Sequence, residues 1–113
     1  MDIKSHTHGD ANVLELSGRF DIHVAPQVSN WLERAASATP PLIVVSMAAV
    51  DFVDSTALAT LVQGMKRCRQ RGGELHLCGL QQQVYMIFEL TRLDKAFTIF
   101  ADESHAVESF RDV

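Results

Sequence analysis

The segment Leu42–Met47 restricts the fold more than any other part of the chain. It is an apolar run of largely β-branched residues that follows Pro41 and shows no alternation of polar and apolar positions. Such a run is typical of a central strand that is buried on both faces of a parallel sheet. The whole chain has 113 residues, of which 47% are hydrophobic and 21% charged, and this length and composition are typical of one globular domain. We therefore expect a single domain, over residues 1–113, built around this strand.

Strand-like and helical segments alternate along the rest of the chain. Strands are expected within residues 2–17, as a pair separated by Gly9 and Asp10, and over residues 74–78 and 97–100. Apolar residues recur at helical spacing over residues 25–38, 55–72, 82–91 and 103–110. Strands that alternate with helices favour a parallel sheet, and the hairpin adds one antiparallel edge. The sequence therefore predicts an α/β fold with a mixed sheet of four to five strands.

The helices are predicted to cover mainly one face of that sheet, because each has a single apolar stripe. In the helix that begins at Ser55, the predicted core residues are Leu58, Leu61, Val62 and Met65. The residues predicted to be exposed on that helix are Thr56, Gln63 and Lys66. Polar strand residues are expected to keep the opposite face of the sheet in contact with water, namely Glu15, Glu74 and His76.

The charge balance argues against several classes of partner. Ten Lys and Arg residues stand against fourteen Asp and Glu residues, which gives a formal net charge of −4. No basic stripe is present that could neutralise a row of phosphates, so direct binding to nucleic acid is not expected. No apolar run approaches the ~20 residues that a membrane span needs, and the N-terminus lacks a hydrophobic signal core. We expect a cytoplasmic protein that does not insert into a membrane.

Cysteine and histidine residues do not mark a cofactor site in the sequence. Cys68 and Cys78 are ten positions apart, a spacing that matches neither a CxxC redox pair nor a four-ligand zinc site, and we interpret them as small hydrophobic residues. His6 and His8 share one face of a predicted edge strand. Two such residues can ligate a metal, but no third ligand is spaced to complete a site, which favours solvated edge residues. No metal or other cofactor is predicted.

Ser55 is the most informative residue, because it stands at a strand-to-helix turn after Asp51 and Asp54. One interpretation is structural, since a serine hydroxyl can cap the free N–H groups of a helix. The segment lacks the G-x-S-x-G elbow of hydrolases, and the chain lacks the G-x-x-x-x-G-K-[ST] phosphate loop. The sequence therefore does not predict an enzyme.

Four segments carry a resemblance to a known family. Residues 54–58, Asp-Ser-Thr-Ala-Leu, resemble the D-S-[ST]-G-L signature of STAS domains, and in particular that of bacterial anti-sigma-factor antagonists. Residues 16–21, followed by Ala25, are similar to the family's L-x-G-x-[LIF]-D-xxx-A segment. Residues 72–75 and 88–93 are similar to two further features of the family. Together these segments cover nearly the whole chain in the family's order.

The resemblance implies a partner-switching role. In this role the antagonist binds a serine kinase of the histidine-kinase-like ATPase type, which also acts as the anti-sigma factor. The kinase phosphorylates the serine that corresponds to Ser55, with Thr56 as a secondary candidate, and a phosphatase of the PP2C type reverses the reaction. The partner-binding candidates are Asp21, His23, Asp54, Thr56 and Ala57. For Asp21, which precedes a predicted helix, a capping role remains an equal alternative.

One residue departs from the family signature, because Ala57 stands where the signature has glycine. The extra methyl group is expected to hinder the close approach of a kinase. This leaves a second hypothesis open, in which the chain is an unphosphorylated STAS-type scaffold subunit of a transporter or sensory complex.

Overall fold

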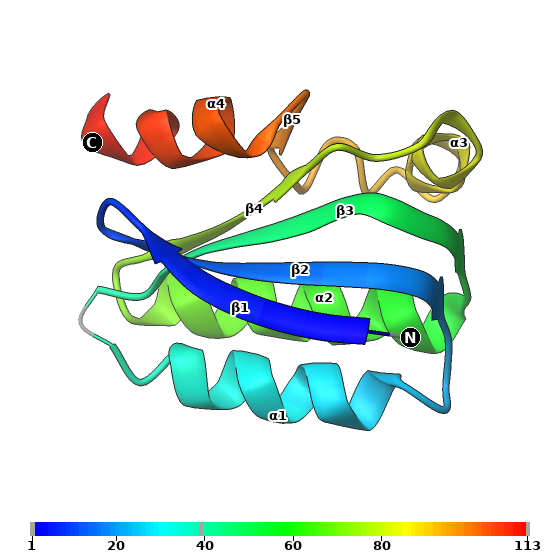
Figure 1. Cartoon of the computed structure of the whole chain (residues 1–113), viewed down its shortest axis with the longest axis horizontal. Coiled ribbons are helices and arrows are strands. Elements are labelled where there is room, and N and C mark those ends of the chain that lie inside the picture. Colours follow the sequence, from blue (N-terminus) through cyan, green and yellow to red (C-terminus); the bar gives the residue numbers. More distant parts are fainter. Residues whose placement is uncertain (1, 39, 113) are drawn as a thin grey trace.

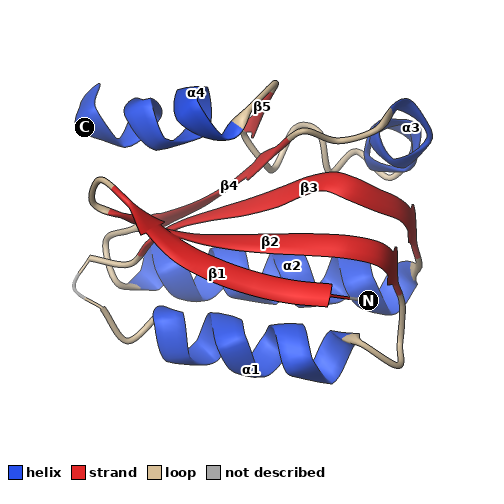
Figure 2. Cartoon of the chain, in the orientation of Figure 1, coloured by secondary structure: helices blue, strands red, loops and turns tan. Residues whose placement is uncertain are grey.

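Five strands form one sheet in the order β1-β2-β3-β4-β5 in the computed structural model, which describes residues 2–38 and 40–112 (Figures 1 and 2). The strands are β1 (Asp2–His8), β2 (Ala11–Phe20), β3 (Leu42–Val53), β4 (Glu74–Cys78) and β5 (Ile99–Phe100). β1 pairs with β2 in the antiparallel sense, and every later pair is parallel. This confirms the predicted mixed sheet with one antiparallel edge.

The helices follow the predicted order with small differences at their ends. They are α1 (Ala25–Ala35), α2 (Ser55–Gln70), α3 (Gln82–Leu90) and α4 (Glu103–Glu108), and a 3-10 turn (Ser109–Asp112) follows α4. β3 extends beyond the predicted run because residues 49–53 pair with the far half of β2. Within residues 2–38 and 40–112, no helix combines the length and the apolar character that crossing a membrane requires.

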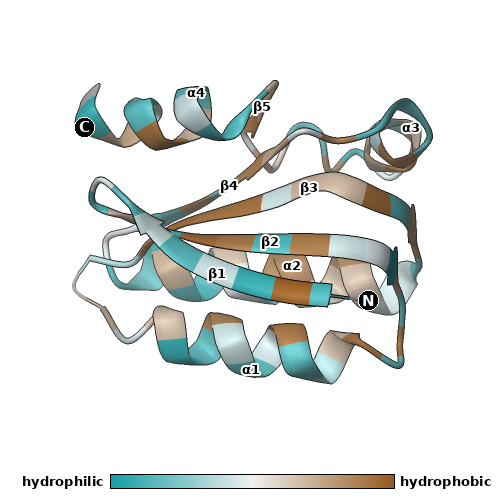
Figure 3. Ribbon diagram, viewed as in Figure 1, coloured by the Kyte–Doolittle hydropathy of each residue, from teal (hydrophilic) through white to brown (hydrophobic). Residues whose placement is uncertain are grey.

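The helices lie mainly on one face of the sheet, as predicted. α1 and α2 cover that face, and α4 lies on the other (Figure 1). Figure 3 shows the apolar side of α1 turned toward the sheet, where Val28 and Leu32 are buried. The larger core fills the space between the sheet and the first two helices, and Val84 and Phe88 of α3 belong to it. A smaller core lies under α4 and consists of Ala11, Val13, Val44, Cys78, Ala106 and Val107.

β4 is buried on both faces, which contradicts the expectation that His76 faces water. Only 9% of the His76 surface is exposed. The imidazole stacks on the Phe110 ring with centroids 4.5 Å apart, and its Nδ1 lies 2.9 Å from the Ser109 hydroxyl. The expectation failed because the covering turn comes from the end of the chain, more than thirty residues after β4. Glu15 is exposed as predicted, and Glu74 is half-buried.

The predicted register of α2 is largely confirmed. Leu58, Leu61 and Met65 are buried, and Val62 is half-buried. Gln63 and Lys66 are exposed, whereas Thr56 is half-buried rather than exposed. Gly64 allows α2 to approach α1, since a Cβ atom there would lie 2.8 Å from Leu32 Cδ1.

Both cysteines are free and buried, and they belong to the two different cores. Burial raises the pKa of the Cys68 thiol to about 11, and it raises the pKa of the Cys78 thiol to about 11 as well. Both thiols are therefore protonated at neutral pH, in agreement with their predicted role as small hydrophobic residues.

Truncation of Leu61 tests the packing of α2. Leu61 is fully buried, so Leu61→Ala should lower the free energy of unfolding by about 2 to 5 kcal/mol, as buried Leu truncations do. The exposed neighbour Gln63 provides the control, and Gln63→Ala should change it by less than about 0.5 kcal/mol. Urea denaturation measures both values. Equal effects of the two substitutions would contradict this register.

His76 should make stability depend on pH. Burial, the largest cause, lowers the pKa of His76 below 6.5, so the unfolded chain takes up this proton more readily than the folded protein does. The contribution of neutral His76 to stability is therefore complete above pH 6.5 and declines as the pH falls through the lowered pKa.

The measurement compares wild type with His76→Phe, which keeps an aromatic ring against Phe110 and does not titrate. Urea denaturation at about pH 8 and about pH 5 gives the stability difference between the two proteins at each pH. Wild type should lose stability relative to the variant at the lower pH, while the other histidines cancel in the comparison. If the stability difference between wild type and His76→Phe were the same at both pH values, the prediction that His76 is neutral in the folded protein and has a lowered pKa would be wrong.

Candidate functional site

The Asp54 carboxylate organises the turn between β3 and α2. Its Oδ1 accepts a hydrogen bond of 2.9 Å from the Ala57 N–H, which makes Asp54 the N-cap of α2. Its Oδ2 accepts a second bond, also of 2.9 Å, from the Ile22 N–H in the loop between β2 and α1. One side chain therefore holds together two turns that follow the carboxyl ends of neighbouring strands.

The loop between β2 and α1 is ordered by Asp21. The Asp21 carbonyl oxygen accepts hydrogen bonds from the N–H groups of Val24 and Ala25, at 3.0 and 2.9 Å, and its Oδ1 accepts one from the His23 N–H at 3.0 Å. These contacts order the turn before α1, but Asp21 does not cap the helix: the N-cap is Val24, and it makes no side-chain capping bond, so the capping alternative for Asp21 is wrong. The His23 side chain is exposed.

Ser55 is exposed at the first position of α2, but it does not cap the helix. Asp54 takes that role, so the interpretation of the Ser55 hydroxyl as the cap is wrong. No hydrogen bond of the Ser55 hydroxyl occurs within residues 2–38 and 40–112. The hydroxyl is thus accessible at a helix start whose geometry another residue has already fixed.

Thr56 and Ala57 lie deeper than the family resemblance suggests. Thr56 is half-buried, and its carbonyl oxygen accepts a 2.9 Å hydrogen bond from the Thr60 hydroxyl. Ala57 has no exposed surface and belongs to the main core. Its methyl group packs inside the protein, so the expectation that it would obstruct a docking kinase is wrong, and Ala57 offers a partner no side-chain contact.

Ile22 is a site residue that the sequence reasoning missed. The residue is 58% exposed, although its N–H is held by the carboxylate of Asp54 beside Ser55. The signal was present as an isolated apolar residue between Asp21 and His23, in a loop where polar residues are expected. An exposed isoleucine on an ordered loop supplies apolar surface that a partner protein can bury.

Two acidic residues, Asp51 and Asp54, precede the start of α2. Asp51, at the end of β3, is exposed, and the carboxylate of Asp54 is fixed next to Ser55. Arg19 supplies a cation to this region, with its Nε 3.9 Å from Asp21 Oδ2 and its guanidinium 3.8 Å above the centre of the Phe52 ring. The site can present a hydroxyl and an apolar side chain to a partner, framed by carboxylates.

A family model describes this combination of fold and motif. The STAS domain model matches residues 2–106. The chain belongs to the STAS domain family. The predicted resemblance is thereby confirmed over nearly the full length of the chain, and the matched range includes residues 54–58, whose motif suggested it.

Two relatives agree with this membership. The anti-sigma F factor antagonist of Paenibacillus polymyxa is 26% identical over 108 residues, which are 95% of this chain and 92% of that protein. The anti-sigma-B factor antagonist of Listeria monocytogenes is 32% identical over 84 residues, which are 74% of each chain.

Two solved structures show the same fold. The anti-sigma-factor antagonist (STAS) domain protein from Planctomyces limnophilus superposes with a TM-score of 0.87 at 20% identity, covering 96% of this chain and 97% of that one. The Bacillus cell fate determinant SpoIIAA in its phosphorylated form superposes with a TM-score of 0.74 at 18% identity, covering 96% and 99%.

Removal of the Asp54 carboxylate should destabilise the protein without disturbing its core. Asp54→Ala loses the cap of α2 and the bond to Ile22 and should lower the free energy of unfolding by about 1 to 3 kcal/mol. Asp54→Asn keeps one acceptor oxygen and should fall between wild type and Asp54→Ala. Asp51→Ala, at an exposed carboxylate in the same segment, is the control and should cost less than about 0.5 kcal/mol. Urea denaturation decides, and equal losses for Asp51→Ala and Asp54→Ala would disprove the bridging role.

Proposed function

We propose that this protein is an anti-sigma-factor antagonist of a partner-switching pathway in the cytoplasm. In the proposed cycle, it binds a serine kinase of the histidine-kinase-like ATPase type, which also serves as the anti-sigma factor, while Ser55 is unmodified. Phosphorylation of Ser55 releases it, and a PP2C-type phosphatase restores the binding form. The main support is the exposed Ser55 hydroxyl at a helix start that Asp54 fixes, in a chain of the STAS family with relatives named as anti-sigma factor antagonists.

The start of α2 can accommodate a phosphate without unfolding. The first turn of a helix has backbone N–H groups without partners inside the helix, and its dipole favours negative charge. Of these groups, the Ala57 N–H already donates to Asp54, whose other oxygen accepts the N–H of Ile22. The phosphorylated form of SpoIIAA, which shares this fold, is consistent with a phosphate being tolerated on such a domain.

The same phosphate should weaken a complex that was formed around a neutral hydroxyl. A phosphoserine adds about −1.5 to −2 charges, and the Asp54 carboxylate beside it cannot turn away because both of its oxygens are bonded to backbone N–H groups. A partner that buries Ile22 would also have to desolvate this charge. A penalty of about 3 kcal/mol weakens binding by roughly two orders of magnitude.

Ser55 fits the role of phosphoacceptor better than Thr56 does. Ser55 is exposed, whereas Thr56 is half-buried and its backbone carbonyl is engaged by Thr60. Because Ala57 is buried, its methyl group gives no reason to expect slow phosphorylation. The departure from the signature glycine therefore no longer favours the scaffold hypothesis.

The test uses the full chain with each serine kinase of this type from the same genome, with Mg-ATP. Wild type and Thr56→Ala should gain one phosphate, mapped to Ser55 by mass spectrometry, and should lose at least about tenfold in affinity for the kinase, or about 1.4 kcal/mol. Ser55→Ala should bind as tightly as unmodified wild type and gain no phosphate. Circular dichroism of phosphorylated wild type should match that of the unmodified protein.

Ser104→Ala is the matched control, because Ser104 is also exposed in the first turn of a helix capped by an aspartate. This variant should be phosphorylated and released like wild type. Transfer to Thr56 alone would refute Ser55 as the acceptor. Tight binding with no transfer to any residue would instead support the unphosphorylated scaffold.

A further inference from the structure

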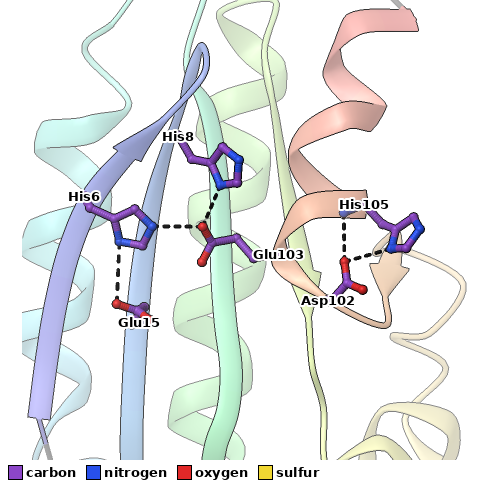
Figure 4. A network of polar contacts seen from close by, with 6 residues as sticks. All are labelled: His6, His8, Glu15, Asp102, Glu103 and His105. Atoms are coloured by element: carbon purple, nitrogen blue, oxygen red, sulfur yellow. Dashed lines mark hydrogen bonds and ion pairs between the residues drawn. The ribbon is translucent and has the colours of Figure 1, made fainter.

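Two histidines and a glutamate converge where the β1–β2 hairpin meets α4 (Figure 4). One oxygen of Glu103, Oε2, lies 2.9 Å from His6 Nε2 and 2.7 Å from His8 Nδ1. The three ligand-type atoms all lie within 4.8 Å of one another. In sequence the third partner is about 95 residues away from the two histidines, so only the fold reveals the cluster.

The backbone fixes the positions of these three residues. His6 and His8 alternate on β1 and pair with Val13 and Ala11 of β2, so both side chains point to the same face of the sheet. α4 packs on that face through Ala106 and Val107. The hairpin turn touches α4 as well, since a Cβ atom on Gly9 would lie 3.6 Å from Val107 Cγ1. Glu103, the first residue of α4, is thereby placed beside both imidazoles.

We propose that His6, His8 and Glu103 form a binding site for a divalent transition metal ion of the zinc class. Two imidazole nitrogens and one carboxylate oxygen make up a ligand set that open zinc sites use, with water completing the tetrahedron. Imidazole ligands favour Zn²⁺, Cu²⁺ or Ni²⁺ over Mg²⁺ and Ca²⁺, which prefer oxygen. Ligand atoms around tetrahedral zinc are about 3.3 Å apart. The two contacts with Glu103 would need to open by about half an ångström, and the two imidazole nitrogens, which lie within 4.8 Å of each other, would have to settle to the same spacing around the ion.

A second carboxylate, that of Glu15, lies beside the other nitrogen of the His6 ring. A chance contact between the histidines and Glu103 would not require it. The His6 ring directs Nε2 to Glu103, while its Nδ1 lies 3.5 Å from Glu15 Oε2. A histidine that binds metal commonly donates its other ring N–H to a carboxylate, which fixes the tautomer and the orientation of the ring. We assign Glu15 as this positioning residue.

The site is accessible to an ion and separate from Ser55. The side chains of His6, His8 and Glu103 are 39%, 42% and 26% exposed. The cluster lies at the amino end of β2, whereas Ser55 follows the carboxyl end of β3. Metal binding would therefore fasten the edge hairpin to the C-terminal helix and leave the proposed kinase-binding surface unobstructed.

The test titrates Zn²⁺ into the full metal-free chain by isothermal titration calorimetry, at neutral pH. Wild type should bind one ion per chain. His6→Gln, His8→Gln and Glu103→Gln should each weaken binding by at least about tenfold, and Glu15→Gln by about 10- to 100-fold. His105→Gln is the matched control: His105 is an exposed histidine of α4 whose Nδ1 contacts Asp102 at 2.8 Å, and its loss should leave zinc affinity unchanged.

Two further measurements separate a metal site from a general effect on folding. Circular dichroism of the metal-free variants shows whether each remains folded, and Zn²⁺ should raise the Tm of wild type but not of His6→Gln/His8→Gln. In nitrogen-15 spectra, Zn²⁺ should shift His6 Nε2 and His8 Nδ1, and Glu15→Gln should alter the His6 ring signals in the absence of metal. Wild-type affinity in the double variant, or no binding at about 1 mM Zn²⁺, would overturn the proposal.

Discussion

The proposed recognition surface depends on the two hydrogen bonds that the Asp54 carboxylate accepts. Parallel strands place their following loops at one edge of a sheet, but they do not fix how those loops lie against each other. Asp54 does so by accepting one backbone N–H from α2 and one from the loop after β2. Hydrogen bonds to a charged group are stronger than those between neutral groups. As a result, Ser55 and Ile22 are presented in a defined arrangement although both are exposed.

The order of the strands and helices can be predicted from the sequence. Contacts between residues from distant parts of the chain cannot. The apolar run of β3 and the helical stripe of α2 are local signals, and the structure confirms both. The alternation of His76 with Leu75 and Leu77 is also a local signal, and it predicts a solvent-exposed face. Nothing in the sequence near β4 indicates that Ser109 and Phe110 cover His76. The same limit applies to Glu103, which contacts His6 and His8 from the other end of the chain.

Two of the errors within the signature segment, those on the cap of α2 and on Ala57, have different causes. Asp and Ser are both good N-cap residues, so their identities alone do not decide which of Asp54 and Ser55 caps α2; the extended backbone of Asp54, with φ −112° and ψ −178°, decides it. The burial of Ala57, by contrast, was available from periodicity. It lies four positions before Leu61 on the same helical face, so its methyl group had to face the core.

The separation of the two ends of the sheet explains how one small domain could carry both proposed sites. β1 is an edge strand in which only Ile3 packs against the main core, and the rest of its side chains are largely exposed. Its attachment therefore rests on the backbone ladder to β2 and on the contacts of His6 and His8 with Glu103. A bound ion would strengthen that attachment at the hairpin end. Because β2 and β3 run from this end to the loops beside Ser55, with two shifts of register between them, a firmer edge would also limit fraying of the sheet that supports Asp54.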